Sequence, residues 1–146
     1  MPRPRAGDWL DDEITNWGAE GINVIVSLLE KDEISELGLG KEPKLCQAHN
    51  IEFISFPITD RGVPASVKET EQVVRRVSAA IVDGKAVAIH CRAGIGRSSL
   101  IAACVLVLNG YDPDFAFAAI GKVRGVEVPD TGIQRQWVST FQATVR

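Results

Sequence analysis

Residues 86–98 read Ala-Val-Ala-Ile-His-Cys-Arg-Ala-Gly-Ile-Gly-Arg-Ser, and this stretch decides the fold of the chain. The apolar residues 86–89 predict a buried strand, and the apolar run over 98–108 predicts a buried helix. A loop with two glycines therefore joins the end of a strand to the start of a helix. Such a loop can direct its backbone N–H groups toward one centre, and that centre suits an anion.

The same loop carries a nucleophile and a guanidinium group. Cys91 lies near the start of the helix, where the helix dipole and inward N–H groups favour the reactive thiolate. Arg97 offers a planar fork of donors that matches two oxygens of a phosphate, and Ser98 can hydrogen-bond the sulfur. Gly94 and Gly96 are expected to adopt positive φ and to let the backbone approach a ligand. This set predicts attack by sulfur on a tetrahedral oxyanion, with a phosphate ester as the favoured substrate.

The domain organisation follows from length and composition. The chain has 146 residues, of which 45% are hydrophobic, so it can bury the core of one domain. The first residues are rich in Pro and Arg, and we expect a flexible N-terminal arm over 1–6 and a single domain over 7–146. No apolar run reaches the roughly 18 residues of a membrane span, and we expect no signal peptide.

Charge and cysteine content narrow the expected partners. A net charge of -3 argues against general binding of nucleic acid and against a polybasic membrane anchor. Three cysteines without tight spacing indicate reduced thiols and a cytoplasmic location. Two histidines leave little material for a metal site, so we expect no metal and no cofactor. We also expect a monomer.

Hydrophobic periodicity predicts alternating strands and helices. The expected strands are 22–28, 51–56 and 86–90, and the expected helices are 8–18, 30–37, 43–49, 67–82, 98–108, 112–122 and 132–145. Asp8 is the expected N-cap of the first helix, and Ser66 with Glu69 forms a capping box before the fourth. This alternation indicates an α/β fold with a mostly parallel central sheet flanked by helices. The ligand crevice should lie at the carboxyl ends of the strands, where Cys91 falls.

Phosphoryl transfer also needs a proton for the departing oxygen. Asp60 is the leading candidate for this acid, because it lies in a loop with Gly and Pro after the strand over 51–56. If that strand lies beside the strand over 86–90, Asp60 ends near Cys91. A solvated turn residue is the alternative role for Asp60, whereas Asp83 is expected to end a helix.

The pattern His-Cys-x-x-Gly-x-x-Arg-Ser over 90–98 resembles the signature of the cysteine-dependent protein tyrosine phosphatase superfamily. The resemblance covers about residues 7–145 and is closest to the small dual-specificity branch, in particular to compact bacterial or cyclin-kinase-associated-phosphatase-like enzymes. It implies a protein tyrosine phosphatase-like fold and a phosphorylated protein or peptide as substrate. The implied reaction is hydrolysis of phosphotyrosine, with phosphoserine and phosphothreonine as further candidates, through a phosphocysteine intermediate.

The resemblance also implies a role for each residue of the loop. Cys91 attacks phosphorus, Arg97 binds the equatorial oxygens, and Ser98 helps the sulfur to leave. His90 orients the loop and tunes the cysteine instead of transferring a proton. Asp60 lies 31 residues before Cys91, in the region where family members carry the acid, and then serves as the base for water. The substrate-binding residues are Arg92, Ala93, Gly94, Ile95, Gly96 and Arg97, although the Arg92 side chain is expected to face a neighbouring loop or solvent.

The segment before the last helix departs from the family pattern. Thr-x-x-Gln over 131–134 is similar to the loop that holds the hydrolytic water, but Asp130 stands where tyrosine-specific members carry the water-positioning amide. Gln134 is therefore a supporting residue, with Gln136 as the other candidate and a polar helix start as the simpler explanation. Some family members also carry a resolving cysteine in a region comparable to that of Cys46.

Two other classes of protein remain as alternatives. A rhodanese-like sulfurtransferase also uses a cysteine in an anion-binding loop, but it needs no general acid, so Asp60 argues against it. A catalytically silent phosphopeptide-binding module is disfavoured because Cys91, Arg97 and Asp60 are all present. Activity toward phosphotyrosine, phosphothreonine and phosphoinositide substrates, with and without a chelator, would reduce the uncertainty most.

Overall fold

The computed structural model of the chain describes residues 1–145, so Arg146 of the domain expected over 7–146 lies outside the described residues. The strands are β1 (Ile22–Ser27), β2 (Glu52–Ser55) and β3 (Ala86–His90). The helices are α1 (Asp8–Ala19), α2 (Lys31–Glu36), α3 (Glu42–Ala48), α4 (Val67–Val82), α5 (Arg97–Leu108), α6 (Pro113–Arg124) and α7 (Gly132–Val145). The predicted alternation of strands and helices is confirmed.

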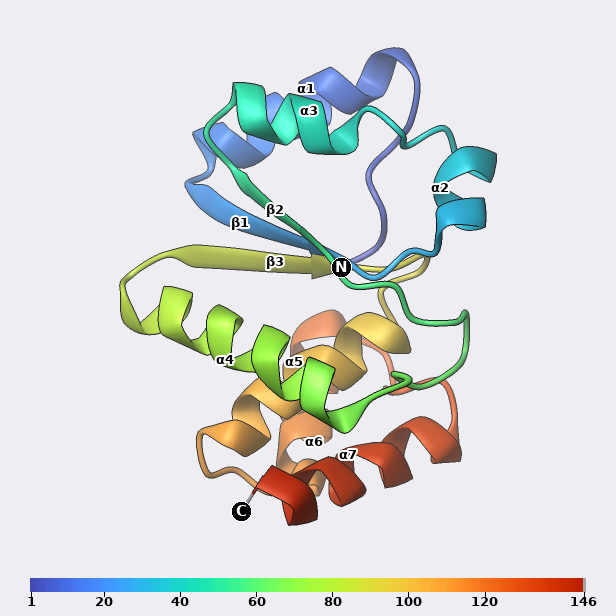
Figure 1. Ribbon diagram of the computed structural model, residues 1–146, viewed down its shortest axis with the longest axis vertical. Helices are drawn as coiled ribbons and strands as arrows, with labels where there is room; N and C mark the ends of the chain where they lie inside the picture. The colour runs from blue at the N-terminus through green and yellow to red at the C-terminus, as the bar shows by residue number, and fades with distance from the viewer. Residues whose placement is uncertain (146) are drawn as a thin grey trace.

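The sheet is parallel and has the strand order β2-β1-β3, so the predicted parallel central sheet is confirmed. The helices α1 to α3 lie on one side of it and α4 to α7 on the other (Figure 1). In the middle strand Val24, Ile25 and Val26 are all buried, as expected of a strand that is covered on both faces. Val24 and Val26 join the core with α4 to α7, whereas Ile25 joins the core with α1 and α3, because side chains alternate along a strand.

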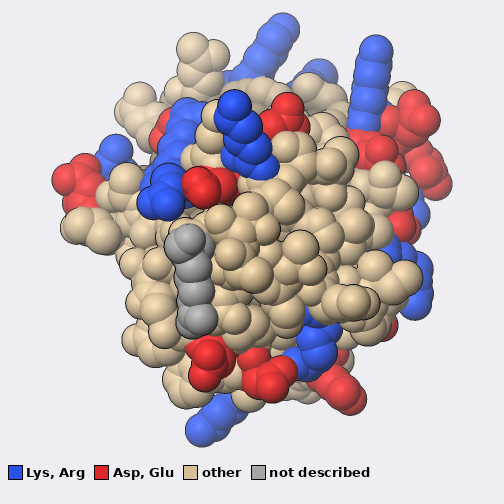
Figure 2. All heavy atoms as spheres, turned by 60° about the horizontal axis from the view of Figure 1, so that its bottom comes forward, with Lys and Arg blue, Asp and Glu red and all other residues tan. Residues whose placement is uncertain are grey.

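The helix α5 is the central helix of the larger core. It packs against α4, α6, α7 and β3, which explains why it is apolar on all sides instead of amphipathic. The loop that precedes α5 is thereby fixed to the best-packed part of the molecule. Figure 2 shows the outer side of the C-terminal helices, where Lys and Arg are interspersed with Asp and Glu around a largely uncharged centre. None of the helices within residues 1–145 has the length and apolarity that crossing a membrane requires.

The strand over 51–56 does not lie beside the strand over 86–90, which was the condition given for Asp60 to end near Cys91, because β1 lies between β2 and β3. The chain nevertheless brings Asp60 toward the loop after β3, because the segment that leaves β2 crosses the carboxyl end of β1. There the Ile58 N–H donates to the Leu28 carbonyl at 3.0 Å. Asp60 and Cys91 therefore line the same pocket, although the strands that precede them are not neighbours in the sheet.

The two N-caps predicted from the sequence, Asp8 and Ser66, have different outcomes. The expected cap at Asp8 is wrong: the N-cap of α1 is Gly7, which has a φ of 64° and makes no side-chain capping bond. Asp8 instead lies in the first turn, where a carboxylate interacts favourably with the helix dipole. Ser66 caps α4, and its hydroxyl accepts a hydrogen bond from the Glu69 N–H at 3.1 Å, but the Glu69 side chain makes no return bond to the Ser66 N–H, so the predicted capping box is only half formed.

Residues 1–6, expected as a flexible arm, lie along the edge of β3 and the loop that follows it. The Met1 ammonium donates to the Ile89 carbonyl at 2.7 Å, and the Arg3 N–H donates to the Arg92 carbonyl at 3.3 Å. The flexibility of this arm remains a prediction, and motion of the arm would have to break these two hydrogen bonds.

Candidate active site

The loop from Cys91 to Gly96 joins β3 to α5. The Cys91 sulfur is almost fully buried and accepts a hydrogen bond from the Gly94 N–H at 3.2 Å. It also lies 3.4 Å from Ser98 Oγ in the first turn of α5, where the hydroxyl can donate to a thiolate. The N-terminal end of α5 adds a dipole that favours negative charge. The structure thus brings the predicted nucleophile and its serine together at a helix start.

The two glycines of this loop, Gly94 and Gly96, differ in backbone conformation and in their neighbours. Gly94 has the expected positive φ, 77°, and a side chain there would also collide with the Met1 backbone. Gly96 has a φ of -91°, so the expectation of a positive φ at this position is wrong. A Cβ atom there would lie 2.6 Å from Asp130 Oδ2 and 3.0 Å from Gln134 Nε2, so a larger residue would have to displace these side-chain ends. The start of α7 therefore contacts the loop directly.

Arg97 is the first residue of α5, and its side chain is only 2% exposed. Its Nη1 donates to Glu33 Oε1 at 2.6 Å and its Nη2 donates to Glu33 Oε2 at 2.9 Å, which makes a two-pronged ion pair. Nη1 also donates to the Ile58 carbonyl at 2.8 Å, and Nη2 donates to Asp60 Oδ1 at 3.1 Å. Within residues 1–145 the Nε–H group has no partner, so it can meet a ligand.

Glu33 and Arg97 keep each other charged. Hydrogen bonding from Arg97 holds the pKa of Glu33 below its usual value, although burial acts in the opposite direction. Burial acts to lower the pKa of Arg97, but the hydrogen bond and charge of Glu33 outweigh this and raise that pKa. Sequence reasoning missed Glu33. It is the third residue of α2 and closes a capping box with Glu30, so helix capping alone accounts for an acidic residue at this position.

Glu33→Gln should lower the free energy of unfolding at neutral pH by about 1–3 kcal/mol, because buried Arg97 loses its ionised partner. The folded pKa of Glu33 lies below its usual value of 4.5. The contribution of the ion pair is therefore complete above that pH and is lost as the pH falls through the folded pKa. Denaturant unfolding of wild type and variant, at neutral pH and in acid, should show a difference that shrinks in acid.

Glu36→Gln is the matched control, because Glu36 lies on the same helix and pairs with Arg92 at 3.4 Å in an exposed position. Its effect should stay within about 0.5 kcal/mol. An equal loss of stability in both variants, or a Glu33→Gln deficit that persists in acid, would contradict the role of the buried pair.

A pocket of about 240 Å³ lies over the loop. Its lining residues are Asp60, Arg61, Cys91, Arg92, Ala93, Gly96, Arg97 and Asp130. Of the other predicted site residues, Gly94 lies against the sulfur and Ile95 packs on the core. The pocket thus places the predicted nucleophile, arginine and acid around one space, together with a second carboxylate.

Gln134 lies outside this pocket and is fully buried. Its Nε2 donates to the Gly62 carbonyl at 3.0 Å, and its Oε1 accepts from the Thr131 N–H at 3.2 Å. The amide thereby ties the loop that carries Asp60 to the start of α7. The other candidate, Gln136, is exposed on α7. The structure therefore places neither glutamine as a pocket residue.

His90, the last residue of β3, is fully buried. Its Nε2 lies 2.7 Å from Oε2 of Glu42, a buried carboxylate at the start of α3. Within residues 1–145 the Nδ1 atom of His90 has no hydrogen-bond partner. The pair joins the end of β3 to α3 and fixes the residue that precedes Cys91. Glu42 gave no signal in the sequence, because its partner is 48 residues away.

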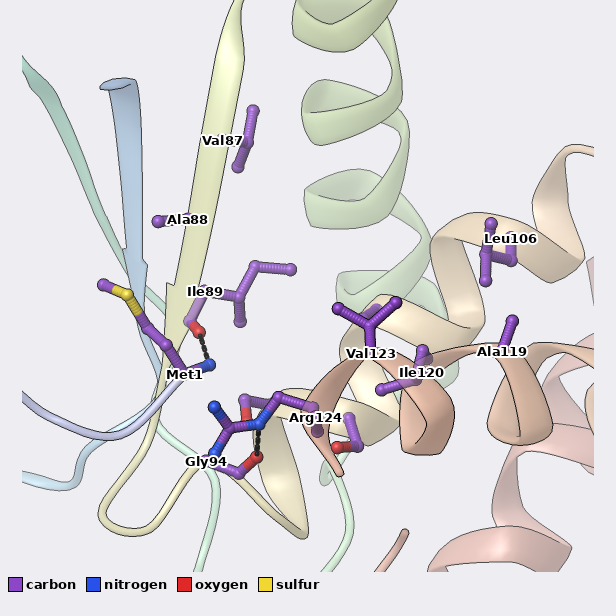
Figure 3. A pocket seen from close by; sticks show the side chains of 13 residues that line it. Met1, Val87, Ala88, Ile89, Gly94, Leu106, Ala119, Ile120, Val123 and Arg124 are labelled. Atoms are coloured by element: carbon purple, nitrogen blue, oxygen red, sulfur yellow. Dashed lines mark hydrogen bonds between the residues drawn. The ribbon is translucent and has the colours of Figure 1, made fainter. Parts of the chain in front are cut away.

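Two arginine side chains connect the loop to neighbouring helices. The Arg92 side chain pairs with Glu36 on α2, so it faces a neighbouring segment as expected. Arg124, at the end of α6, donates to the Gly94 carbonyl at 3.2 Å (Figure 3). It also donates to the Ala93 carbonyl at 3.4 Å. With these carbonyls engaged, the loop can offer N–H groups to an anion. The apolar pocket of Figure 3, about 430 Å³, is lined by neither Cys91 nor Arg97.

The other two cysteines are buried in the cores. Cys46 belongs to the core with α1 and α3, on the opposite side of the sheet from the core that includes Cys91. Burial, and then the charge of Glu42, raises the pKa of Cys46 to about 12, so its thiol is not reactive. This argues against Cys46 as a resolving cysteine. Burial also raises the pKa of Cys104.

Taken together, the parallel α/β fold and a cysteine and an arginine on a strand-to-helix loop define a cysteine-dependent phosphatase domain of the protein tyrosine phosphatase type. Within residues 1–145, no group of three or more His, Cys, Asp or Glu side chains is arranged to hold a metal ion. A family model described as "Polymorphic toxin system, DSP-PTPase phosphatase" matches residues 1–111. The chain belongs to this family, and the resemblance to dual-specificity phosphatases is confirmed.

Two proteins of similar sequence support the same assignment. The chain is 32% identical over 126 residues to protein 197R of Invertebrate iridescent virus 6, which is named as a tyrosine phosphatase; the match covers 79% of this chain and 47% of the viral protein. It is 25% identical over 126 residues to cyclin-dependent kinase inhibitor 3 of Rattus norvegicus, with 85% of this chain and 59% of that protein covered. The chain thus spans about half the length of these relatives.

Solved structures share the fold. The kinase associated phosphatase, with its catalytic cysteine replaced by serine, matches with a TM-score of 0.91 at 21% identity and covers 99% of this chain and 85% of that one. Tk-PTP in its active form matches with a TM-score of 0.80 at 22% identity and covers 98% of this chain and 88% of that one. The predicted protein tyrosine phosphatase-like fold is therefore confirmed.

Proposed function

We propose that this protein hydrolyses phosphotyrosine, and also phosphoserine or phosphothreonine, on protein or peptide substrates through a phosphocysteine intermediate. One observation carries the proposal. The Cys91 sulfur is hydrogen-bonded by the Gly94 N–H and lies beside Ser98 at the start of α5, in a pocket that also holds Arg97 and Asp60. This arrangement supports the proposal, because a sulfur nucleophile, a guanidinium and a carboxyl group would then surround one phosphate ester.

Substrate binding rearranges one hydrogen bond. In the free protein Arg97 Nη2 holds Asp60, while Nε–H is unoccupied. A phosphate that takes Nε–H and Nη2 as a two-pronged ligand replaces the Asp60 carboxylate on Nη2, and Glu33 keeps the guanidinium in place. Asp60 is then released toward the leaving group. Binding of the phosphate and freeing of the acid are thereby coupled through Arg97.

The first chemical step uses these groups together. The Cys91 thiolate attacks phosphorus, a P–S bond forms, and the P–O bond to the substrate oxygen breaks. That oxygen takes a proton from Asp60, while Arg97 and the N–H groups of the loop stabilise the charge on the other three oxygens. Water then attacks phosphorus and gives a proton to a carboxylate of the pocket, the P–S bond breaks, and the thiolate leaves with a hydrogen bond from the Ser98 hydroxyl. The products are a free alcohol or phenol and inorganic phosphate.

The broader expectations belong to the same proposal. We infer a single catalytic domain over 7–146 that is monomeric and cytoplasmic and uses no metal or cofactor. It would act on phosphoproteins and not on nucleic acid or a membrane. Support comes from the net charge of -3 and from three cysteines that are all free thiols.

A substrate panel tests the proposal. The purified protein is offered phosphotyrosine, phosphothreonine and phosphoserine peptides, phosphoinositides, and thiosulfate with cyanide, each with and without a chelator. We expect release of phosphate from the peptides that the chelator does not change. Transfer of sulfur would establish a sulfurtransferase, and tight binding of phosphopeptides without turnover would establish a binding module. Either outcome would overturn the phosphatase assignment.

Asp60→Asn separates the acid from the nucleophile. With a phosphopeptide, whose leaving group needs a proton, kcat should fall by roughly 10²–10⁴. With an activated aryl phosphate the loss should be much smaller, because that leaving group departs without a proton. Asp83→Asn, at the exposed end of α4, is the matched control and should leave both rates unchanged. Equal losses on both substrates for Asp60→Asn would show that another group is the acid.

A further inference from the structure

A second carboxylate in the pocket has no assigned task. Asp130 lines the same space as Cys91 and Asp60. Its Oδ2 lies so close to the loop that a Cβ atom on Gly96 would be only 2.6 Å away. Asp60 accepts a hydrogen bond from Arg97, whereas the Asp130 carboxylate forms no hydrogen bond or ion pair with residues 1–145 and is exposed to solvent.

The position of Asp130 is fixed by its neighbours. The Thr131 N–H donates to Gln134 Oε1 at 3.2 Å, and the Gln134 N–H donates to Thr131 Oγ1 at 3.1 Å. These reciprocal bonds close the start of α7 directly after Asp130. The second bond of the Gln134 amide, to the Gly62 carbonyl, attaches this helix start to the loop that carries Asp60. The two carboxylates are therefore held on linked segments at the same pocket.

The Asp130 carboxylate lies in the pocket where we propose that a phosphate binds, and no cation within residues 1–145 neutralises it. It repels a phosphate dianion, and this repulsion weakens substrate binding unless the carboxylate serves the reaction. A water molecule between the carboxylate and phosphorus removes the conflict, because the water donates a hydrogen bond to the carboxylate and presents its lone pair to phosphorus. Such a carboxylate orients the water and takes its proton.

We propose that Asp130 is the catalytic base of the second step, a role that rests on the proposed phosphatase activity. Water attacks the phosphorus of the phosphocysteine and gives its proton to Asp130, the P–S bond breaks, and the Cys91 thiolate leaves with the electron pair. Asp60 then acts as the acid of the first step only. The two carboxyl groups have different roles: Asp60 gives a proton to the leaving group in the first step, and Asp130 takes the proton of water in the second. Afterwards Asp130 returns its proton to solvent, from which Asp60 is reprotonated.

Rapid kinetics with an aryl phosphate test this assignment, because the colour of the released phenol reports the first step alone. In Asp130→Asn we expect a burst of about one equivalent of phenol at the wild-type rate, followed by turnover that is slower by roughly 10²-fold. Acid quench followed by mass spectrometry should show phosphate on Cys91 at levels far above wild type. Asp130→Glu, which restores a carboxylate, should recover part of the turnover. Asp12→Asn, on the exposed side of α1, is the control and should behave as wild type.

The outcomes separate this proposal from the function on which it rests. If wild type releases no phenol, the phosphatase assignment fails. If wild type is active and Asp130→Asn shows unchanged turnover, or loses the burst and the turnover together while binding vanadate normally, Asp130 is not the base. Accumulation of phosphocysteine in Asp60→Asn but not in Asp130→Asn would assign the base to Asp60 and also overturn the proposal.

Discussion

Cys91→Ser should abolish turnover of phosphate esters while leaving their binding intact. The substitution replaces the sulfur of the proposed nucleophile with a hydroxyl that is not ionised near neutral pH, so we expect kcat to fall by roughly 10⁴-fold or more. The groups that bind phosphate are unchanged, because Arg97 is held by Glu33 and the loop is held by Arg124. Steady-state kinetics measure the loss, and calorimetry with a phosphotyrosine peptide measures the retained affinity.

Cys46→Ala is the matched control, because this thiol lies on the opposite side of the sheet and is not reactive. It should keep wild-type turnover if the fold is intact, which the thermal unfolding midpoint checks. Residual activity of Cys91→Ser above about a tenth of wild type would show that another group performs the attack. Loss of peptide binding together with turnover would show that the variant had lost the structure of the loop.

The fold could be predicted from sequence in its elements but not in its strand order. Apolar runs and their periods are local signals, and they placed β1, β2, β3 and the helices within a few residues. The neighbour of a strand is decided by contacts between segments far apart in the chain, on which the local pattern is silent. The central position of β1 is nevertheless consistent with its sequence, because Val24, Ile25 and Val26 form the unbroken apolar run of a strand covered on both faces.

In the site, too, the sequence predicts contacts within one loop but not contacts between segments far apart in the chain. Cys91, Arg97 and Ser98 share one loop, so their spacing alone predicts their meeting at one centre. Glu33 and Glu42 reach the loop from 64 and 48 residues away, and each lies in the first turn of a short helix where acidic residues are common. Nothing local distinguishes such residues from surface carboxylates. Their burial against Arg97 and His90 becomes visible only in three dimensions.

The contact between Asp130 and Gly96 could not be predicted from the sequence, although both residues could be singled out there. The sequence showed that Asp130 departs from the family pattern, but not that its carboxylate lies against Gly96. The glycine was expected for its backbone freedom, but its φ is negative and the structure shows instead that two side chains approach it closely. A departure in the segment before α7 and a glycine in the loop are thus two parts of one contact.

Arg97→Lys should impair both turnover and the binding of oxyanions. Lysine keeps the positive charge, but it cannot hold both oxygens of Glu33 and the Ile58 carbonyl while presenting two further donors to a phosphate. Because the guanidinium stabilises charge that develops on phosphorus oxygens, we expect kcat to fall by about 10²–10³. It also positions Asp60, so the loss should be larger with a phosphopeptide than with an activated aryl phosphate.

The decisive measurement for Arg97→Lys is inhibition by vanadate and by phosphate, which report oxyanion binding without chemistry. We expect both inhibition constants to rise by at least about tenfold, because one of two parallel charge-assisted hydrogen bonds is lost. Arg75→Lys is the control, because Arg75 pairs with Glu71 on the surface of α4. Vanadate and phosphate should inhibit this variant as strongly as they inhibit wild type. Near-wild-type inhibition of Arg97→Lys by these anions would rule out phosphate binding by Arg97. The buried pair with Glu33 would then be explained by stability alone, as the acid dependence of Glu33→Gln measures independently.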